Sequence, residues 1–181
     1  MISEEWFPVR IWYMDAPELC SEAKSIFEAA RIDQYENPVY PNGYTTYFSN
    51  ENIPELDSFK DKLEALIDRG RITAIWLNHM KTGGYHANHV HANSHFSGTF
   101  YVNEPQNAAK ILFHNPHWST YQFCIPPLSE EEKNDKYNAR YVHYAPKAGR
   151  ILLWNSWLEH EVEVNNSIEP RLSISFNIQK I

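Results

Sequence analysis

Hydrophobic residues follow two different periods along this chain of 181 residues. In residues 1–70, apolar side chains recur every three or four positions in two segments, 17–31 and 54–69, which predicts two amphipathic helices. Shorter runs at 9–14 and 44–48 are rich in β-branched and aromatic residues, and each predicts a strand. The first part of the chain is therefore expected to be mostly helical.

After Gly70, which is expected to end the second helix, the pattern changes to short β-rich runs separated by polar turns. About eight such strands are typical of a jelly roll, in which two antiparallel sheets face each other. We therefore predict a mainly β fold, a cupin-like double-stranded β-helix whose N-terminal α-helices pack on one sheet. Residues 1–181 are expected to form one domain with its jelly-roll core at 71–181. The polar stretch 126–139 predicts a solvated loop or a lid. The runs that predict strands are 71–80, 89–91, 96–103, 110–114, 120–125, 140–144, 150–154, 159–164 and 171–179.

Composition and charge exclude several classes of protein. The net charge of −7 and the absence of a basic run argue against a nucleic-acid partner. No run approaches the roughly 20 apolar residues of a membrane span. The N-terminus is acidic and lacks a secretory signal, and Cys20 and Cys124 form no Cys-x-x-Cys motif, so we expect a reducing cytoplasm. Asn165-Asn166-Ser167 matches a glycosylation acceptor, but without a signal sequence it predicts only a turn. A homodimer is the default expectation.

The pair His89 and His91 is the first candidate for chemistry. On a strand, side chains two apart point the same way from backbone positions roughly 6.5–7 Å apart, so both imidazoles can reach one metal ion. A third ligand must come from elsewhere, and His160 on a later predicted strand is the candidate. The chain has nine histidines, and an isolated His-x-His is more often structural, so His86 stays open as a competitor. The Gly83-Gly84 lead-in and the downstream polar residues favour a site.

The last predicted strand carries a candidate anion clamp. Arg171 and Ser173 share one face of it, and a guanidinium with a neighbouring hydroxyl suits the two-point binding of a carboxylate. An ordinary half-exposed strand would show the same alternation. Asn78 ends the apolar face Ile72-x-Ala74-x-Trp76 and either binds the same acid or pairs with a neighbouring backbone, the commoner role. Tyr101 is either a core aromatic or a further hydroxyl donor to that acid.

Together these residues resemble a known family. From about Ile75 to Ile178 the chain is similar to the 2-oxoglutarate- and Fe(II)-dependent oxygenases. The resemblance implies a double-stranded β-helix, iron bound by His89, His91 and His160, and 2-oxoglutarate bound by Arg171. It also implies a dioxygenase that couples decarboxylation of 2-oxoglutarate to hydroxylation, but it does not supply the substrate, for which a small molecule and a peptide both stay open. The segments that carry the resemblance are Tyr85-His86-x-x-His89-x-His91-x-x-Ser94-x-x-Ser97-Gly98-x-x-Tyr101, Pro146-x-x-Gly149-Arg150-Ile151-Leu152-Leu153-Trp154-x-Ser156-Trp157-Leu158-x-His160-x-Val162 and Arg171-x-Ser173-x-Ser175-Phe176-Asn177.

One position departs from the wider superfamily, whose metal site has two histidines and one carboxylate. Here His91 occupies the carboxylate position. Three neutral imidazoles leave a divalent ion with its full formal charge of +2, so an anionic chelator should bind more strongly. Glu159 and Glu161 are unsuitable replacements, because on a strand they point away from the side of His160, and Asn93 would be a poor ligand.

Two alternative functions remain open at this point. A cupin-like three-histidine dioxygenase would use the metal without 2-oxoglutarate and would not need Arg171. A non-enzymatic jelly roll would bind a carbohydrate or a partner protein, since one fold hosts many functions. Trp76, Trp154 and Trp157 would line a pocket or, more commonly, pack in the core.

Overall fold

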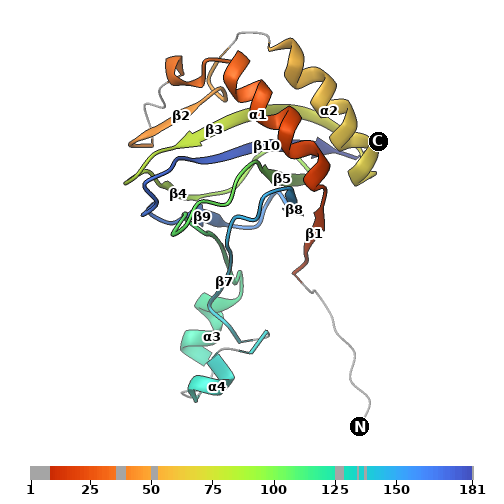
Figure 1. The fold of residues 1–181 in the computed structure, drawn as a ribbon. Coiled ribbons are helices and arrows are strands. Elements are labelled where there is room, and N and C mark those ends of the chain that lie inside the picture. Colours follow the sequence, from red (N-terminus) through yellow and green to blue (C-terminus); the bar gives the residue numbers. More distant parts are fainter. Residues whose placement is uncertain are drawn as a thin grey trace.

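The computed structural model describes residues 9–35, 40–49, 53–124, 129–133, 135–136 and 138–180. Its strands form two sheets, one of six strands in the order β1-β8-β5-β10-β3-β2 and one of four in the order β4-β9-β6-β7 (Figure 1). All neighbouring strands are antiparallel, so the predicted mainly β, jelly-roll fold is confirmed. The strands are β1 (Ile11–Asp15), β2 (Gly43–Thr45), β3 (Arg71–Met80), β4 (His86–His89), β5 (Phe96–Tyr101), β6 (Ile111–His114), β7 (Tyr141–Tyr144), β8 (Arg150–Asn155), β9 (His160–Val162) and β10 (Arg171–Gln179).

The predicted helices cover the outer face of the six-stranded sheet, above β3, β5 and β10 (Figure 1). The second of them starts with Pro54 in its first turn, where the missing backbone N–H is not needed. It is closed by Asp68, whose φ of 47° is left-handed, rather than by Gly70. Gly70 instead allows the chain to enter β3 close to the end of β10, because a Cβ there would lie 2.1 Å from the carbonyl oxygen of Gln179. The helical segments are η1 (Pro17–Leu19), α1 (Cys20–Ala29), η2 (Ile32–Gln34) and α2 (Pro54–Ile67).

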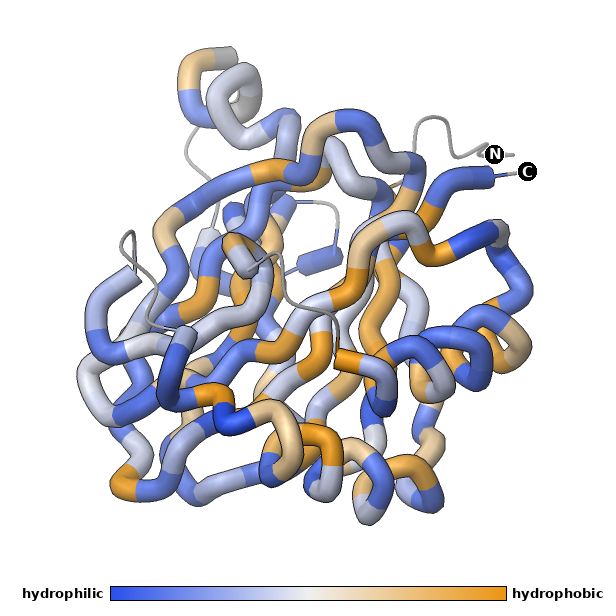
Figure 2. Tube along the Cα trace, turned by 90° about the horizontal axis from the view of Figure 1, so that it is seen from above, coloured by the Kyte–Doolittle hydropathy of each residue, from blue (hydrophilic) through white to orange (hydrophobic). Residues whose placement is uncertain are grey.

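Strict alternation along β10 separates two hydrophobic cores. Ile174, Phe176 and Ile178 pack against α1 and α2, each burial contributing roughly 1.5–3 kcal/mol. Residues at the intervening positions, such as Arg171 and Ser173, point into the space between the sheets. That space holds its own apolar cluster, and the tube in Figure 2 shows the strands alternating between hydrophobic and hydrophilic positions. The large members of the inter-sheet core are Tyr101, Phe113, Leu152, Trp154 and Leu158.

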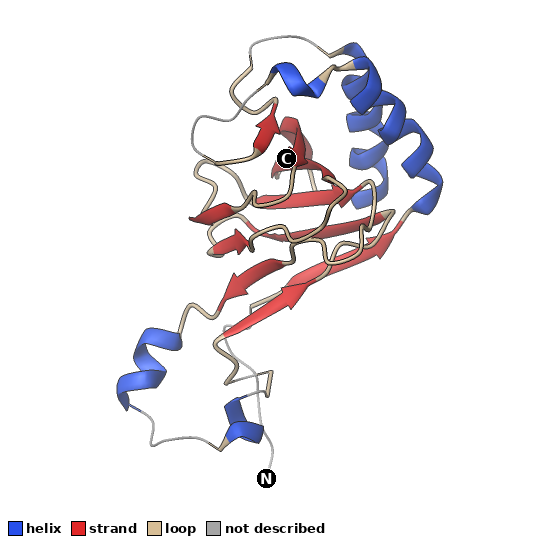
Figure 3. Ribbon diagram, turned by 60° about the vertical axis from the view of Figure 1, so that its left-hand side comes forward, coloured by secondary structure: helices blue, strands red, loops and turns tan. Residues whose placement is uncertain are grey.

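Residues 120–124 of the strand predicted at 120–125 lie in a helix instead, and residue 125 lies outside the described residues. Here α3 spans Trp118–Cys124, and the short α4 (Glu130–Lys133) follows within the predicted polar loop. Figures 1 and 3 show both helices away from the two sheets, beyond β7. A short aromatic run has no periodicity that separates strand from helix, and this one has no sheet neighbour to pair with. Phe123 is accordingly 83% exposed.

A β-bulge changes which residues of β3 share a face. The pairing of β3 with β10 shifts register between Asn177 and Ile178. Ile72 therefore belongs to the helix-side core, whereas Trp76 and Asn78 face the space between the sheets. The prediction that Ile72 and Asn78 lie on one face is wrong, because one extra residue in a strand inverts the alternation.

None of the described helices has the length and apolarity needed to cross a bilayer.

Candidate active site

Three histidine side chains converge between the two sheets. His89 ends β4, His91 follows it, and His160 opens β9 directly opposite His89. One nitrogen from each ring lies within 4.8 Å of the others, and the ring centroids are 4.3 to 5.1 Å apart. In the part of the chain that the structure describes, no other group of three possible metal-binding side chains comes so close. The predicted histidine pair thus meets its predicted third partner.

His91 reaches this position from outside the strand on which it was predicted. The strand ends at His89, and the backbone N–H of His91 donates instead to the carbonyl of Ser156 at 3.0 Å. Ser156 is buried and its hydroxyl pairs with that of Ser97 at 2.8 Å. The loop that carries His91 is therefore tied to the turn after β8.

Two of the three imidazoles have a defined tautomer. Nδ1 of His89 lies 2.7 Å from the carbonyl oxygen of Ala87, and Nδ1 of His160 lies 2.9 Å from that of Leu158. Because a carbonyl only accepts, each Nδ1 carries the proton and leaves the Nε2 lone pair free. Burial lowers the pKa of His89, and it lowers the pKa of His91 to about 4 and that of His160 to about 3. The rings are therefore neutral at pH 7, the form that ligates a metal.

The other candidate ligands lie apart from this group. Glu159 accepts a hydrogen bond from Asn88 at 3.3 Å, and Glu161 lies 3.7 Å from His114, on the side of β9 opposite His160, as predicted. His86 lines the same cavity but stacks on Tyr40, with ring centroids 4.2 Å apart. It does not belong to the group of three nitrogens.

Arg171 brings a buried positive charge to the same cavity. Arg171 is only 2% exposed. Nε donates to the carbonyl of Ala109 and Nη1 to the hydroxyl of Ser173, both at 3.2 Å. Among the described residues, no carboxylate forms an ion pair with it. Burying a cation without an acidic partner is costly unless a ligand supplies the negative charge.

The two weaker candidates, Asn78 and Tyr101, differ in their surroundings. Asn78 lines the cavity, yet its amide oxygen accepts from Thr45 at 2.9 Å and its nitrogen donates to Ser175 at 3.0 Å. The ring of Tyr101 lies under Arg171, with 5.0 Å from Cζ to the ring centroid. Its buried hydroxyl has no hydrogen-bond partner among the described residues, and burial raises the pKa of Tyr101.

Asn165, which the sequence presents only as a turn residue, is a fully buried hydrogen-bonding centre. Its side chain donates to the carbonyl of Met80 at 3.1 Å and accepts from the backbone N–H of Ala109 at 3.0 Å. The carbonyl of that same Ala109 accepts from Arg171. Asn165 therefore helps to fix the position of Ala109, whose carbonyl orients the guanidinium of Arg171. No spacing pattern distinguishes such an asparagine from one in an exposed turn.

A cavity of about 260 Å³ opens onto the three histidines, Arg171 and Ser173. Its walls come from both sheets and from the segment around β2, which ends at Thr45 rather than extending to Phe48 as predicted. The aromatic residues of that segment were not predicted to line the site, because no motif marks them. The lining residues are Tyr40, Thr45, Tyr47, Phe48, Trp76, Asn78, His86, His89, Val90, His91, Gly98, Thr99, Ile111, Trp154, His160, Val162, Arg171, Ser173 and Ser175.

Comparison with known families decides between the functions that the sequence left open. A family model described as "Putative 2OG-Fe(II) oxygenase" matches residues 74–177, more than half of the chain. The chain belongs to the 2-oxoglutarate- and Fe(II)-dependent oxygenases. Members of this family use Fe(II), 2-oxoglutarate and dioxygen on small-molecule or peptide substrates, so the predicted cofactors and oxygenase function are confirmed with the substrate unknown.

Solved oxygenase structures share the fold at low sequence identity. A prolyl-4-hydroxylase from Pseudomonas putida is 12% identical, with a TM-score of 0.63 and 94% of each chain covered. HygX from Streptomyces hygroscopicus, solved with nickel, 2-oxoglutarate and hygromycin B, is 12% identical, with a TM-score of 0.58 over 93% of this chain and 82% of that one. A Trichoplax adhaerens prolyl hydroxylase, solved with a hypoxia-inducible-factor peptide, is 13% identical, with a TM-score of 0.59 over 93% and 83%. No curated protein matches in sequence.

The oxygenase site is chemically suited to the family's cofactors. Three neutral imidazoles offer nitrogen donors suited to Fe(II), and three protein ligands leave coordination positions for other molecules. The buried guanidinium of Arg171 has no carboxylate partner among the described residues. A bound dicarboxylic acid would supply one. Both features lie in one cavity.

Proposed function

We propose that His89, His91 and His160 ligate Fe(II) in this oxygenase and that Arg171, with Ser173, binds the distal carboxylate of 2-oxoglutarate. The observation that carries this assignment is the shared cavity of three clustered histidine nitrogens and one buried guanidinium without an acidic partner. The reaction we assign is hydroxylation of an organic substrate coupled to decarboxylation of 2-oxoglutarate. Asn78 and Tyr101 are assigned to the same carboxylate end as auxiliary donors.

The residues of this chain contribute position, charge and exclusion of water. The carbonyls of Ala87 and Leu158 hold the protons of His89 and His160 on Nδ1, which keeps both rings in the ligating tautomer. Ala109 and Ser173 orient the guanidinium before any ligand binds, so little freedom is lost on binding. When bound, iron would supply the means to activate dioxygen, which is the oxidant, while 2-oxoglutarate is itself oxidised and decarboxylated. The protein determines which C–H bond is presented to them.

His91 in place of a carboxylate leaves the bound ion with more positive charge. We expect the site to depend on an anionic co-substrate more than a site with an aspartate would. His91→Ala should abolish stoichiometric binding of Fe(II) or Mn(II), whereas His91→Asp should retain it. His143→Ala on the exposed face of β7 is the control. Unchanged metal content in His91→Ala would remove His91 from the site and make His86 the next candidate.

The decisive experiment is thermal unfolding with Mn(II) and 2-oxoglutarate, added singly and together. A ligand that binds only the native state raises stability, by about 2.7 kcal/mol at one hundred times its Kd. We expect the largest increase with both ligands. In Arg171→Ala the increment due to 2-oxoglutarate should fall to about a third or less, as its Kd rises roughly 30-fold or more. Arg171→Lys keeps the charge without the planar two-point contact and should bind with intermediate affinity.

One control variant and two contrary outcomes complete this experiment. Arg140→Ala removes an exposed arginine and should leave both increments unchanged. An undiminished increment from 2-oxoglutarate in Arg171→Ala would contradict the clamp. A response to metal alone, with none to 2-oxoglutarate, would favour the three-histidine dioxygenase chemistry instead. We also propose a cytoplasmic location, because Cys20 and Cys124 form no Cys-x-x-Cys motif and two cysteines in a chain of this size suit a reducing compartment.

A further inference from the structure

The cavity has two chemically different ends. At the inner end lie Arg171 and Ser173, each at most 2% exposed. From His91 outward, aromatic rings follow one another with rising exposure. Trp76 lies 5.7 Å from His91 between ring centroids, and Tyr47 lies 4.7 Å from Trp76.

Phe48 completes this series at the mouth of the cavity. Its ring lies 5.1 Å from that of Tyr47. Exposure rises from 7% at Trp76 to 50% at Tyr47 and 56% at Phe48. Val90, which is 49% exposed, lines the same cavity between two of the candidate ligands. The mouth therefore presents apolar surface to solvent within reach of the histidine group.

The described residues of this outer part of the cavity carry no charge. Of the described residues that line the cavity, only Arg171 carries a charge, and no acidic or lysine side chain is among them. The proposed function assigns Arg171 to 2-oxoglutarate. A charged group entering from the mouth would thus lose water without gaining an opposite charge.

Resting on the proposed function, we propose that the mouth formed by Tyr47, Phe48, Trp76 and Val90 binds an uncharged aromatic or similarly flat apolar group of the prime substrate. This surface holds that group beside His91, where the oxidation takes place. Such a group occurs both on free small molecules and on peptide side chains. The chemistry recognised is the same in the two cases.

The test uses full-length protein loaded with Mn(II) and 2-oxoglutarate without oxygen, so that no turnover occurs. Paramagnetic Mn(II) accelerates the proton relaxation of any probe that binds near it, and Zn(II) provides the diamagnetic reference. The probes are benzyl alcohol, benzoate, benzylammonium and glucose. We expect relaxation of benzyl alcohol, and a Kd at least ~10-fold higher for either charged analogue. A preference for a charged analogue or for glucose would overturn the proposal.

Two exposed aromatics provide a matched pair of variants. Phe48→Ala should raise the Kd of benzyl alcohol roughly 3- to 10-fold, because it removes apolar contact area. Trp157→Ala removes a ring that is equally exposed, at 55%, but lies outside this cavity, and should leave the Kd unchanged. Equal effects of the two variants would overturn the proposal.

Further measurements distinguish a peptide from a small molecule as the source of the aromatic group. They also distinguish failure of this inference from failure of the proposed function. Tighter binding of N-acetylphenylalaninamide than of benzyl alcohol would assign the group to a peptide, and weaker binding would assign it to a small molecule. In Phe48→Ala the stabilisation by Mn(II) and 2-oxoglutarate should persist. If it persists while the probes fail to bind, the substrate inference is wrong and the proposed function stands. If it is absent even in the unmodified protein, the proposed function fails first.

Discussion

At the scale of single residues, the strongest functional signals are polar groups whose local partners are incomplete. Arg171 is buried, yet its two hydrogen bonds go to a carbonyl and a hydroxyl, neither of which neutralises it. Tyr101 beneath it keeps a buried hydroxyl without a partner among the described residues. Native proteins rarely leave such groups uncompensated, so a buried guanidinium that lines the cavity and lies against the Tyr101 ring indicates a ligand. Gly98, on the cavity wall, is fixed for a different reason, since a Cβ there would lie 2.4 Å from the ring of Phe176.

The role of Asn165 makes a residue-scale prediction. Asn165→Ala would leave the N–H of Ala109 buried without its partner, at a cost of roughly 1–3 kcal/mol, and would remove one hydrogen bond from the carbonyl of Met80. We expect the free energy of unfolding, measured in urea on the metal-free protein, to fall by about 1–4 kcal/mol. The control is Asn166→Ala, which removes only an exposed hydrogen bond to Val164 and should change stability by less than about 0.5 kcal/mol. Similar losses in both variants would contradict the role assigned to Asn165.

At the scale of elements, periodicity predicted those parts of the fold that bury one face. The strand predicted at 171–179 and the one at 71–80 agree with β10 and β3 because each alternates against a core. The helix in place of the strand predicted at 120–125 belongs to a segment without such a core. The bulge in β3 was equally unpredictable, since it depends on pairing with β10. For the site, spacing and the family resemblance predicted the three histidines that cluster, whereas the aromatic mouth around Tyr47 arises only from tertiary placement.

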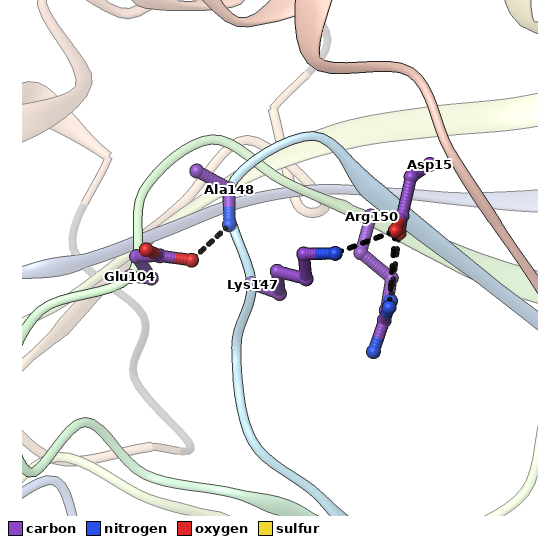
Figure 4. A network of polar contacts seen from close by, with 5 residues as sticks. All are labelled: Asp15, Glu104, Lys147, Ala148 and Arg150. Atoms are coloured by element: carbon purple, nitrogen blue, oxygen red, sulfur yellow. Dashed lines mark hydrogen bonds and ion pairs between the residues drawn. The ribbon is translucent and has the colours of Figure 1, made fainter.

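Ion pairs of Asp15 with Lys147 and Arg150, here called the charged clip, join the end of the edge strand β1 to the six-stranded sheet. Figure 4 shows the Asp15 carboxylate accepting hydrogen bonds from Lys147 at 2.6 Å and from Arg150 at 2.8 and 3.1 Å. Hydrogen bonds from Arg150 and Lys147 hold the pKa of Asp15 well below its usual value of 3.8. Since the folded-state pKa is the lower one, the stabilisation is present above pH 3.8 and is lost as the pH falls below it.

This clip predicts a pH-dependent difference between variants. Asp15→Asn should lower the midpoint of thermal unfolding at pH 7 by a few degrees, and the difference from the unmodified protein should shrink below about pH 4. Added salt should shrink it as well, because the clip is partly exposed. Asp61→Asn, an exposed position in α2, is the control and should shift the midpoint little at either pH. A deficit that is independent of both pH and salt would show that Asp15 acts through packing rather than charge.

At the scale of the whole molecule, the two halves of the proposed site belong to different sheets. His89 and His160 lie on β4 and β9 of the four-stranded sheet, and His91 follows β4 directly. Arg171 and Ser173 lie on β10 of the six-stranded sheet. A metal ion alone would therefore cross-link strands within one sheet. A co-substrate that contacts both the metal and Arg171 would join the two sheets across the cavity.

Hydrogen exchange of backbone amides can distinguish these two kinds of cross-link. Mn(II) alone should slow exchange in β4 and β9, because its ligands come from those strands and opening them would release it. Addition of 2-oxoglutarate should extend the protection to β10 and to its neighbour β3. In Arg171→Ala the protection should stay confined to β4 and β9 even with both ligands present, whereas Arg140→Ala should behave like the unmodified protein. Protection of β10 by metal alone would mean that the sheets are already coupled through their shared core, and the co-substrate would then not be the element that joins them.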